Sequence, residues 1–156
     1  MSITFVQAGD VWTDFNADIS IAHGCNLQGI MGAGIARQVK EKFPKLYAGY
    51  ALACASNTIK LGEVFPYWVE HEPPKLIYNL MTQWDTSGAS YDGVWYSLKA
   101  LRGLMIKFET PIVSMPQIGA GLGGLNWRVV KAMLQEVFEA DNKLEVIVYE
   151  DYKPAS

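Results

Sequence analysis

The chain has 156 residues, of which 50% are hydrophobic and 19% are charged, and its formal net charge is −3. This length fits one domain spanning residues 1–156. Such a domain buries about two thirds of its unfolded surface and needs no disulfide bond or metal ion to fold. The negative charge argues against a duplex-binding surface, which requires clustered lysine and arginine. Two cysteines, no signal-like N-terminus and no apolar stretch of bilayer length favour a reduced, cytoplasmic protein with no membrane partner.

Strand-like and helix-like segments alternate along the chain. In chain order they are strands at residues 3–7 and 19–22, helices at 35–43 and 46–52, strands at 62–69 and 76–81, a helix at 94–105, a strand at 112–115, a helix at 127–138 and a strand at 144–149. The alternation predicts an α/β fold, a three-layer α/β/α sandwich around a mixed, mostly parallel six-stranded sheet. Such sheets bind ligands beyond the carboxyl ends of their strands.

Two glycine-rich segments, residues 29–34 and 119–124, each lie between a predicted strand and a predicted helix. Glycine lets the main chain approach a ligand closely, and the following helix N-terminus adds partial positive charge. One such loop could be only a tight turn between layers. Two loops that converge on one crevice predict a ligand with more than one phosphate.

The second loop also satisfies the spacing G-x-G-x-x-G, which alone is a weak signal. A dinucleotide-binding unit needs further strand–helix units after this loop, and only one more predicted strand follows here. Neither loop has the Gly-Lys-Ser/Thr of a P-loop. Hydride transfer and nucleoside triphosphate hydrolysis are therefore not expected.

Three segments in order, residues 3–10, 23–36 and 114–122 followed by Trp127, resemble the macrodomain family over nearly the whole chain. The similar branch includes ADP-ribose 1''-phosphate phosphatases, terminal ADP-ribose glycohydrolases and antitoxins that remove ADP-ribose from DNA. The resemblance implies a small-molecule partner, ADP-ribose or its 1''-phosphate. The ligand-binding residues it implies are Asp10, Val11, Gly24, Gly32, Ala33, Gly34, Ile35, Gln117, Gly119, Ala120, Gly121, Leu122, Gly123 and Tyr149.

A few side chains decide between activities within this branch. The similar glycohydrolases use a lysine directly after the strand at 76–82 and an aspartate in the second loop, where this chain has Gln83 and Gly123. By contrast, His23 and Asn26 match the histidine and asparagine of the yeast-type phosphatase. We therefore predict dephosphorylation of ADP-ribose 1''-phosphate, with His23 and Asn26 as catalytic residues. His23 would donate or accept a proton, or attack phosphorus, and the sequence leaves these roles open.

Several alternatives stay open. The protein could instead bind ADP-ribose without turnover, or hydrolyse an ester such as O-acetyl-ADP-ribose or an ADP-ribosyl carboxylate. His23 could be a structural hydrogen-bonding residue, Asp10 a turn cap and Tyr149 ordinary strand packing. We expect Trp84 to shape the distal-ribose end of the site.

We expect no metal and no cofactor, because no His, Asp and Glu residues have metal-ligand spacing. We also expect a monomer and no direct nucleic-acid binding.

Overall fold

The computed structural model describes residues 2–140 and 143–150. Its elements are β1 (Ile3–Val6), α1 (Val11–Asn16), β2 (Ser20–Asn26), α2 (Gly34–Lys42), α3 (Pro44–Ala55), β3 (Val64–Val69), β4 (Lys75–Gln83), α4 (Tyr91–Lys107), β5 (Ile112–Pro116), α5 (Trp127–Phe138) and β6 (Glu145–Tyr149). Every predicted strand and helix is present, and α1 is an additional short helix. The helices within the described ranges are all too short or too polar to cross a membrane.

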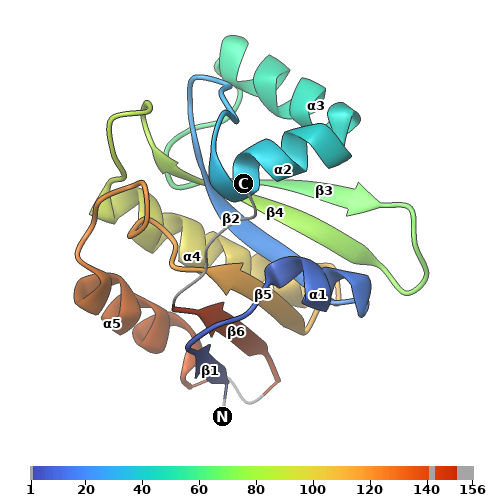
Figure 1. Cartoon of the computed structure of the whole chain (residues 1–156), viewed down its shortest axis with the longest axis vertical. Coiled ribbons are helices and arrows are strands. Elements are labelled where there is room, and N and C mark those ends of the chain that lie inside the picture. The colour runs from blue at the N-terminus through green and yellow to red at the C-terminus, as the bar shows by residue number, and fades with distance from the viewer. Residues whose placement is uncertain (1, 141–142, 151–156) are drawn as a thin grey trace.

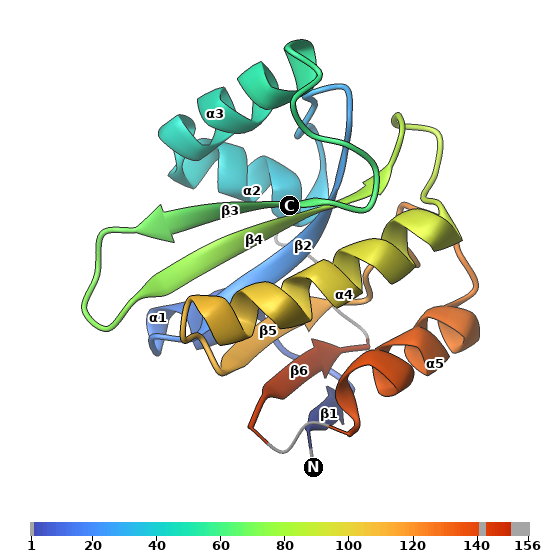
Figure 2. The ribbon, with the colours of Figure 1, turned by 180° about the vertical axis from the view of Figure 1, so that it is seen from behind.

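The strands form one six-stranded sheet in the order β1-β6-β5-β2-β4-β3. Only β3 runs antiparallel to its neighbour β4, and the other neighbouring pairs are parallel. Helices α1, α2 and α3 lie on one side of the sheet, and α4 and α5 lie on the other (Figures 1 and 2). The predicted three-layer sandwich with a mixed, mostly parallel sheet is therefore confirmed.

Strand β4, which lies between β2 and the edge strand β3, is buried on both faces, as is usual for a strand covered by helices on both sides. Leu76, Tyr78 and Leu80 pack into the core under α4 and α5, whereas Ile77 and Met81 pack under the other three helices. A polar side chain on such a strand cannot reach bulk water and has to find a partner inside the protein.

The carboxyl ends of the parallel strands β2, β4 and β5 lie at the same edge of the sheet. The segments that leave this edge are the first glycine loop after β2, residues 84–90 after β4, and the second glycine loop after β5. Figure 1 shows the loop after β2 at the top of the molecule, the loop after β4 at the upper left and the loop after β5 at the left. The topology thus brings together the two loops that the sequence separates.

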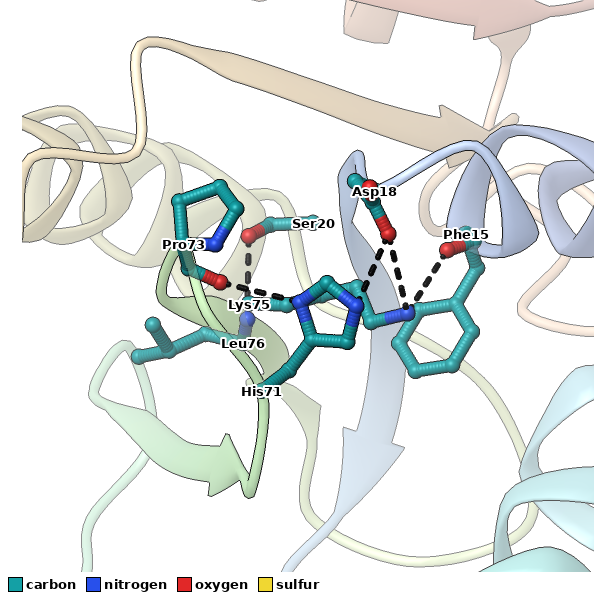
Figure 3. Close-up of polar contacts among 7 residues, drawn as sticks. All are labelled: Phe15, Asp18, Ser20, His71, Pro73, Lys75 and Leu76. Carbon is teal, nitrogen blue, oxygen red and sulfur yellow. Dashed lines mark hydrogen bonds and ion pairs between the residues drawn. The ribbon is translucent and has the colours of Figure 1, made fainter.

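A polar cluster at the opposite edge joins the connection between α1 and β2 to the β3–β4 hairpin (Figure 3). The buried Lys75 Nζ donates a hydrogen bond to the Phe15 carbonyl oxygen at 2.9 Å and lies 3.9 Å from Asp18 Oδ1. His71 Nε2 lies 3.0 Å from the same Asp18 oxygen. This cluster links the two connections at the end of the strands that lies opposite the two glycine loops.

Candidate functional site

A cavity of about 550 Å³ lies between the two glycine loops. Its lining comes from the end of β2, the start of α2, the end of β4 and the second loop. The lining residues are His23, Gly24, Ala33, Gly34, Ile35, Ala36, Thr82, Gln83, Pro116, Gln117, Ile118, Gly119, Gly121, Leu122 and Gly123. The loops therefore converge on one cavity, as the sequence predicts.

The N-terminus of α2 opens into this cavity without a side-chain cap. Ala33 occupies the N-cap position and supplies no capping hydrogen bond, and the first turn contains no acidic residue. By contrast, α1, α4 and α5 are capped by the side chains of Asp10, Ser90 and Asn126. The first N–H groups of a helix have no acceptor within it, so α2 presents free donors and the positive end of its dipole to the cavity.

Asn26 holds the first glycine loop in shape from within. Its Nδ2 donates to the Ile30 carbonyl oxygen at 2.8 Å, and its Oδ1 accepts from the N–H groups of Gln28 and Ile30. The buried Tyr50 hydroxyl of α3 donates to the Asn26 carbonyl oxygen at 2.6 Å. The amide of Asn26 is engaged within the loop and does not line the cavity, and its predicted catalytic contact with a ligand remains a prediction.

His23 lies in the wall of the cavity with only 2% of its surface exposed. Its Nε2 is 2.6 Å from Asn79 Oδ1, and Asn79 Nδ2 donates to the Phe65 carbonyl oxygen at 2.9 Å. Because Asn79 thereby presents its oxygen, the Nε2–H tautomer of His23 satisfies the contact. Burial lowers the pKa of His23 to about 4, although the Asn79 hydrogen bond opposes this shift. The imidazole is therefore neutral at pH 7, and its catalytic role remains a prediction.

Cys25 lies beside this imidazole, with its Sγ 3.7 Å from His23 Nε2. Burial raises the pKa of the Cys25 thiol well above its ordinary value. A buried thiol that resists ionisation is a poor nucleophile. The geometry agrees with the packing role that the sequence favours for Cys25.

The positions that similar glycohydrolases fill with lysine and aspartate line the cavity here as Gln83 and Gly123. Gln83 Nε2 donates to the Asp85 carbonyl oxygen at 2.5 Å, which turns the amide toward its own loop. A Cβ atom at position 123 would lie 2.5 Å from the Gly119 carbonyl oxygen and 2.8 Å from the Ala89 Cβ. The second loop therefore leaves no room for a side chain at position 123. The described lining residues include no amine and no carboxylate.

The predicted adenine-binding residues lie outside this cavity. Asp10 is exposed and its Oδ1 accepts from the Trp12 N–H at 2.9 Å, so it caps α1, and Val11 is buried at the first position of that helix. Tyr149 is 8% exposed, and its hydroxyl donates to Asp14 Oδ2 at 2.6 Å. Burial raises the pKa of Tyr149 to about 12. The adenine contacts of Asp10, Val11 and Tyr149 therefore remain predictions.

Gly32 and Ala120 adjoin lining residues in the chain but do not themselves line the cavity in the described part. Trp84, expected at the distal-ribose end, lines a different cavity.

Sequence reasoning missed four residues that line the cavity, namely Ala36, Thr82, Pro116 and Ile118. Thr82 illustrates why, because it reaches the site only through the pairing of β4 with β2. A Cβ at Gly24 would lie 2.8 Å from Thr82 Oγ1, so these two positions pack against each other across the strands. Only the position of Thr82 at a strand end could have indicated this contact.

The sequence matches the family model described as Macro domain over residues 22–134. A DNA ADP-ribosyl glycohydrolase of Thermus aquaticus is 34% identical over 84% of this chain and 37% of its own length, so the chain spans little more than a third of that relative. The human ADP-ribose glycohydrolase OARD1 is 36% identical over 94% of this chain and 90% of its own. An ADP-ribose 1''-phosphate phosphatase of Candida albicans is 27% identical over 76% of this chain and 81% of its own.

Among solved structures, the macrodomain of Thermus aquaticus DarG superimposes with a TM-score of 0.83 at 32% identity. The match covers 95% of this chain and 97% of that one. The similar structure and the similar sequences therefore indicate the same fold.

Proposed function

Because the chain belongs to the macrodomain family, we propose that the cavity between its glycine loops binds ADP-ribose, with the diphosphate at the N-terminus of α2. The observation that carries this proposal is the uncapped N-terminus of α2, whose free N–H groups face the cavity. A diphosphate would accept hydrogen bonds from these groups and gain from the helix dipole. The named activities of the Thermus and human relatives support ADP-ribose as the ligand.

This placement of the diphosphate also assigns a position to each end of ADP-ribose. The distal ribose would lie toward Gln83 and Gly123, which line the cavity with the second loop. The adenine would lie toward Asp10, whose exposed carboxylate can accept a hydrogen bond from an amino group while it caps α1. Both assignments rest on the resemblance of the motifs and on the ligand's length.

We further propose that the protein hydrolyses ADP-ribose 1''-phosphate. A terminal phosphate placed near Gly123 would meet no carboxylate, so it avoids the repulsion that an acidic residue there would cause. In the reaction the oxygen of a water molecule attacks phosphorus and the bond from phosphorus to O1'' breaks. One proton of the water passes by way of the proton acceptor to O1'', so the products are ADP-ribose and inorganic phosphate. The loop N–H groups would stabilise the charge on the transferred phosphate.

His23 is the proposed proton acceptor in this reaction. Its Nε2–H is held by Asn79 Oδ1, so the lone pair for proton transfer would be on Nδ1. A second candidate function, binding without turnover, is favoured by a specific observation. The 2% exposure of His23 and its pKa of about 4 make it a weak base at neutral pH.

The test combines ADP-ribose binding by calorimetry with phosphate release from ADP-ribose 1''-phosphate. The wild type should do both, and His23→Ala should lose about 100-fold or more in kcat while its ADP-ribose affinity changes little. His71→Ala, the other histidine, should match the wild type. Tight binding without phosphate release would favour the binding protein and overturn the phosphatase proposal. Hydrolysis of O-acetyl-ADP-ribose, measured on the same preparations, would identify an esterase instead.

A further inference from the structure

A second cavity of about 640 Å³ lies on the other side of the β2 and β4 ends from the first. It is formed by the first residue after β2, the C-terminal part of α3 with the loop that follows, the residue after β4, and the first turns of α4. Its lining residues are Leu27, Cys54, Asn57, Ile59, Lys60, Leu61, Trp84, Asp92 and Tyr96.

Two large aromatic side chains in this cavity are open to solvent. Trp84 is 64% exposed and Tyr96 is 57% exposed. Neither ring pairs with another ring among the described residues, although most other tryptophans and phenylalanines do. Exposed aromatic rings that line a concavity, rather than a convex surface, are informative because burial against a planar partner would stabilise both.

One positive and one negative side chain accompany the two rings. Lys60 and Asp92 are exposed lining residues, and neither forms an ion pair with another described residue. Together they supply hydrogen-bond donors and acceptors with no net charge. This combination suits a neutral, planar group with both kinds of polar atom on its edge, and it suits an anion poorly.

The two cavities are separated by the backbone of neighbouring strands. The Leu27 N–H lies 3.1 Å from the Gln83 carbonyl oxygen and 3.3 Å from that of Trp84. Gln83, the last residue of β4, lines the first cavity and Trp84, the residue after β4, lines the second, so consecutive residues face different cavities. A ligand in the second cavity therefore needs none of the first cavity's residues, and the inference is independent of the function proposed above.

We propose that the second cavity binds a nucleobase, which stacks on the Trp84 indole while its polar edge meets Lys60 and Asp92. Leu27 and Ile59, which also line the cavity, supply apolar contacts for the rest of the base. A nucleobase combines a large π-face with edge donors and acceptors, which is the chemistry that this lining presents. The base could belong to a free nucleoside or to a single strand.

The experiment uses the full chain labelled with 5-fluorotryptophan, so that each tryptophan gives its own ¹⁹F signal. Uridine, which cannot occupy an adenine site as adenine does, and a short single-stranded oligouridine are titrated separately. We expect a saturable shift of the Trp84 signal while the signal of Trp68, which is 51% exposed on β3, stays in place. Tighter binding of the oligouridine would identify a single strand as the source, and equal binding per base would identify the nucleoside.

Variants test whether stacking is responsible. Ligand-observed NMR should show that Trp84→Ala and Trp84→Leu each lower the affinity for uridine about tenfold or more relative to the wild type. Trp84→Phe should lower it only slightly. Trp68→Ala is the matched control and should bind as the wild type does. The proposal is overturned by an unmoved Trp84 signal, by equal affinity of Trp84→Leu and wild type, or by an equally tight complex with N-acetyl-leucinamide, which would indicate an apolar docking surface.

Discussion

His23 is an ionisable residue whose side chain lies on a face of β2 that is buried in the core. Ile21 and Cys25 flank it on β2 and belong to the core under α1, α2 and α3. Without Asn79 the buried imidazole would have only the weakly hydrogen-bonding Cys25 thiol beside it, and losing the stronger partner costs about 1–3 kcal/mol. The hydrogen bond therefore satisfies the ring but does not make its charged form favourable.

This burial predicts a pH-dependent stability. The unfolded chain binds a proton at His23 below its ordinary pKa of 6.5, whereas the folded chain binds it only near 4. Stability from neutral His23 is therefore fully present above pH 6.5 and is lost as the pH falls toward 4, by about 3 kcal/mol in total. Urea unfolding of wild type and His23→Gln at pH 7.5 and pH 5 should show a smaller loss for the variant. Equal losses would contradict the assignment.

Gly123 gives a second prediction at the residue scale. Gly123→Asp places a carboxylate where similar glycohydrolases have one, but its Cβ would meet the Gly119 carbonyl oxygen at 2.5 Å. We expect the unfolding free energy to fall by about 1–3 kcal/mol and no glycohydrolase activity to appear. Gly121→Ala is the control, since a Cβ there meets nothing within 4 Å. Robust glycohydrolase turnover by Gly123→Asp would show that the loop adapts easily.

Helix α2 lacks a stabilising side-chain cap at its N-terminus, and the same N-terminus is the proposed diphosphate site. A capping side chain at Ala33 would stabilise the helix, and its extended backbone, with φ −149° and ψ 159°, is that of an N-cap residue. Its absence leaves the donors that the proposed diphosphate needs. Stability and binding should therefore change in opposite directions when a cap is added.

Ala33→Asp tests this opposition. The new carboxylate should raise the unfolding free energy by about 1 kcal/mol as a cap, and should weaken ADP-ribose binding about tenfold or more by repulsion and by occupying the N–H groups. Ala33→Ser adds a capping oxygen without charge, so it should stabilise the helix and weaken binding less. Thermal unfolding and calorimetry on both variants measure the two effects. Unchanged affinity in Ala33→Asp would be inconsistent with a diphosphate at this helix end.

The sequence predicted the long elements well because their apolar residues repeat with a clear period. It missed α1, whose six residues are too few for a helical period to be evident. It also ended the second strand at Ala22, whereas β2 continues to Asn26 because pairing with β4 extends to its end. Such errors come from tertiary pairing that no local pattern encodes.

For the candidate site, motifs predicted the two loops and most lining residues, but not which polar atoms are free. Asn26 is engaged with Ile30 and Gln28, and Trp84 faces the second cavity. Thr82 enters the first cavity through strand pairing. The partners of Asn26 are near in sequence but depend on the conformation of the loop, and the contacts of Thr82 depend on strand pairing, so a single sequence does not reveal them.

At the scale of the whole molecule, the fold separates stability from function along its strands. The glycine loops occupy the carboxyl edge of the sheet, whereas Asp18, His71 and Lys75 form the polar cluster at the other edge (Figure 3). The buried Lys75 contributes most there, because its Nζ satisfies the Phe15 carbonyl oxygen and lies 4.0 Å from the Phe15 ring centroid.

Lys75→Met keeps the length of the side chain but removes its Nζ. We expect the unfolding free energy to fall by about 1–3 kcal/mol because the Phe15 carbonyl oxygen loses its partner, while ADP-ribose affinity stays within error of the wild type. His71→Ala, at the half-exposed part of the cluster, should cost no more than about 1 kcal/mol. A large loss of ADP-ribose affinity in folded Lys75→Met would show that the two edges are coupled.

We propose that the free N–H groups at the start of α2 and the second glycine loop together hold the ADP-ribose diphosphate. An amide ¹H–¹⁵N NMR titration of the wild type with ADP-ribose tests it most directly. We expect saturable shifts at Gly34, Ile35 and Ala36 together with residues 119–123, and little change around Lys75. No saturable shift, or shifts that leave the start of α2 unmoved, would contradict it.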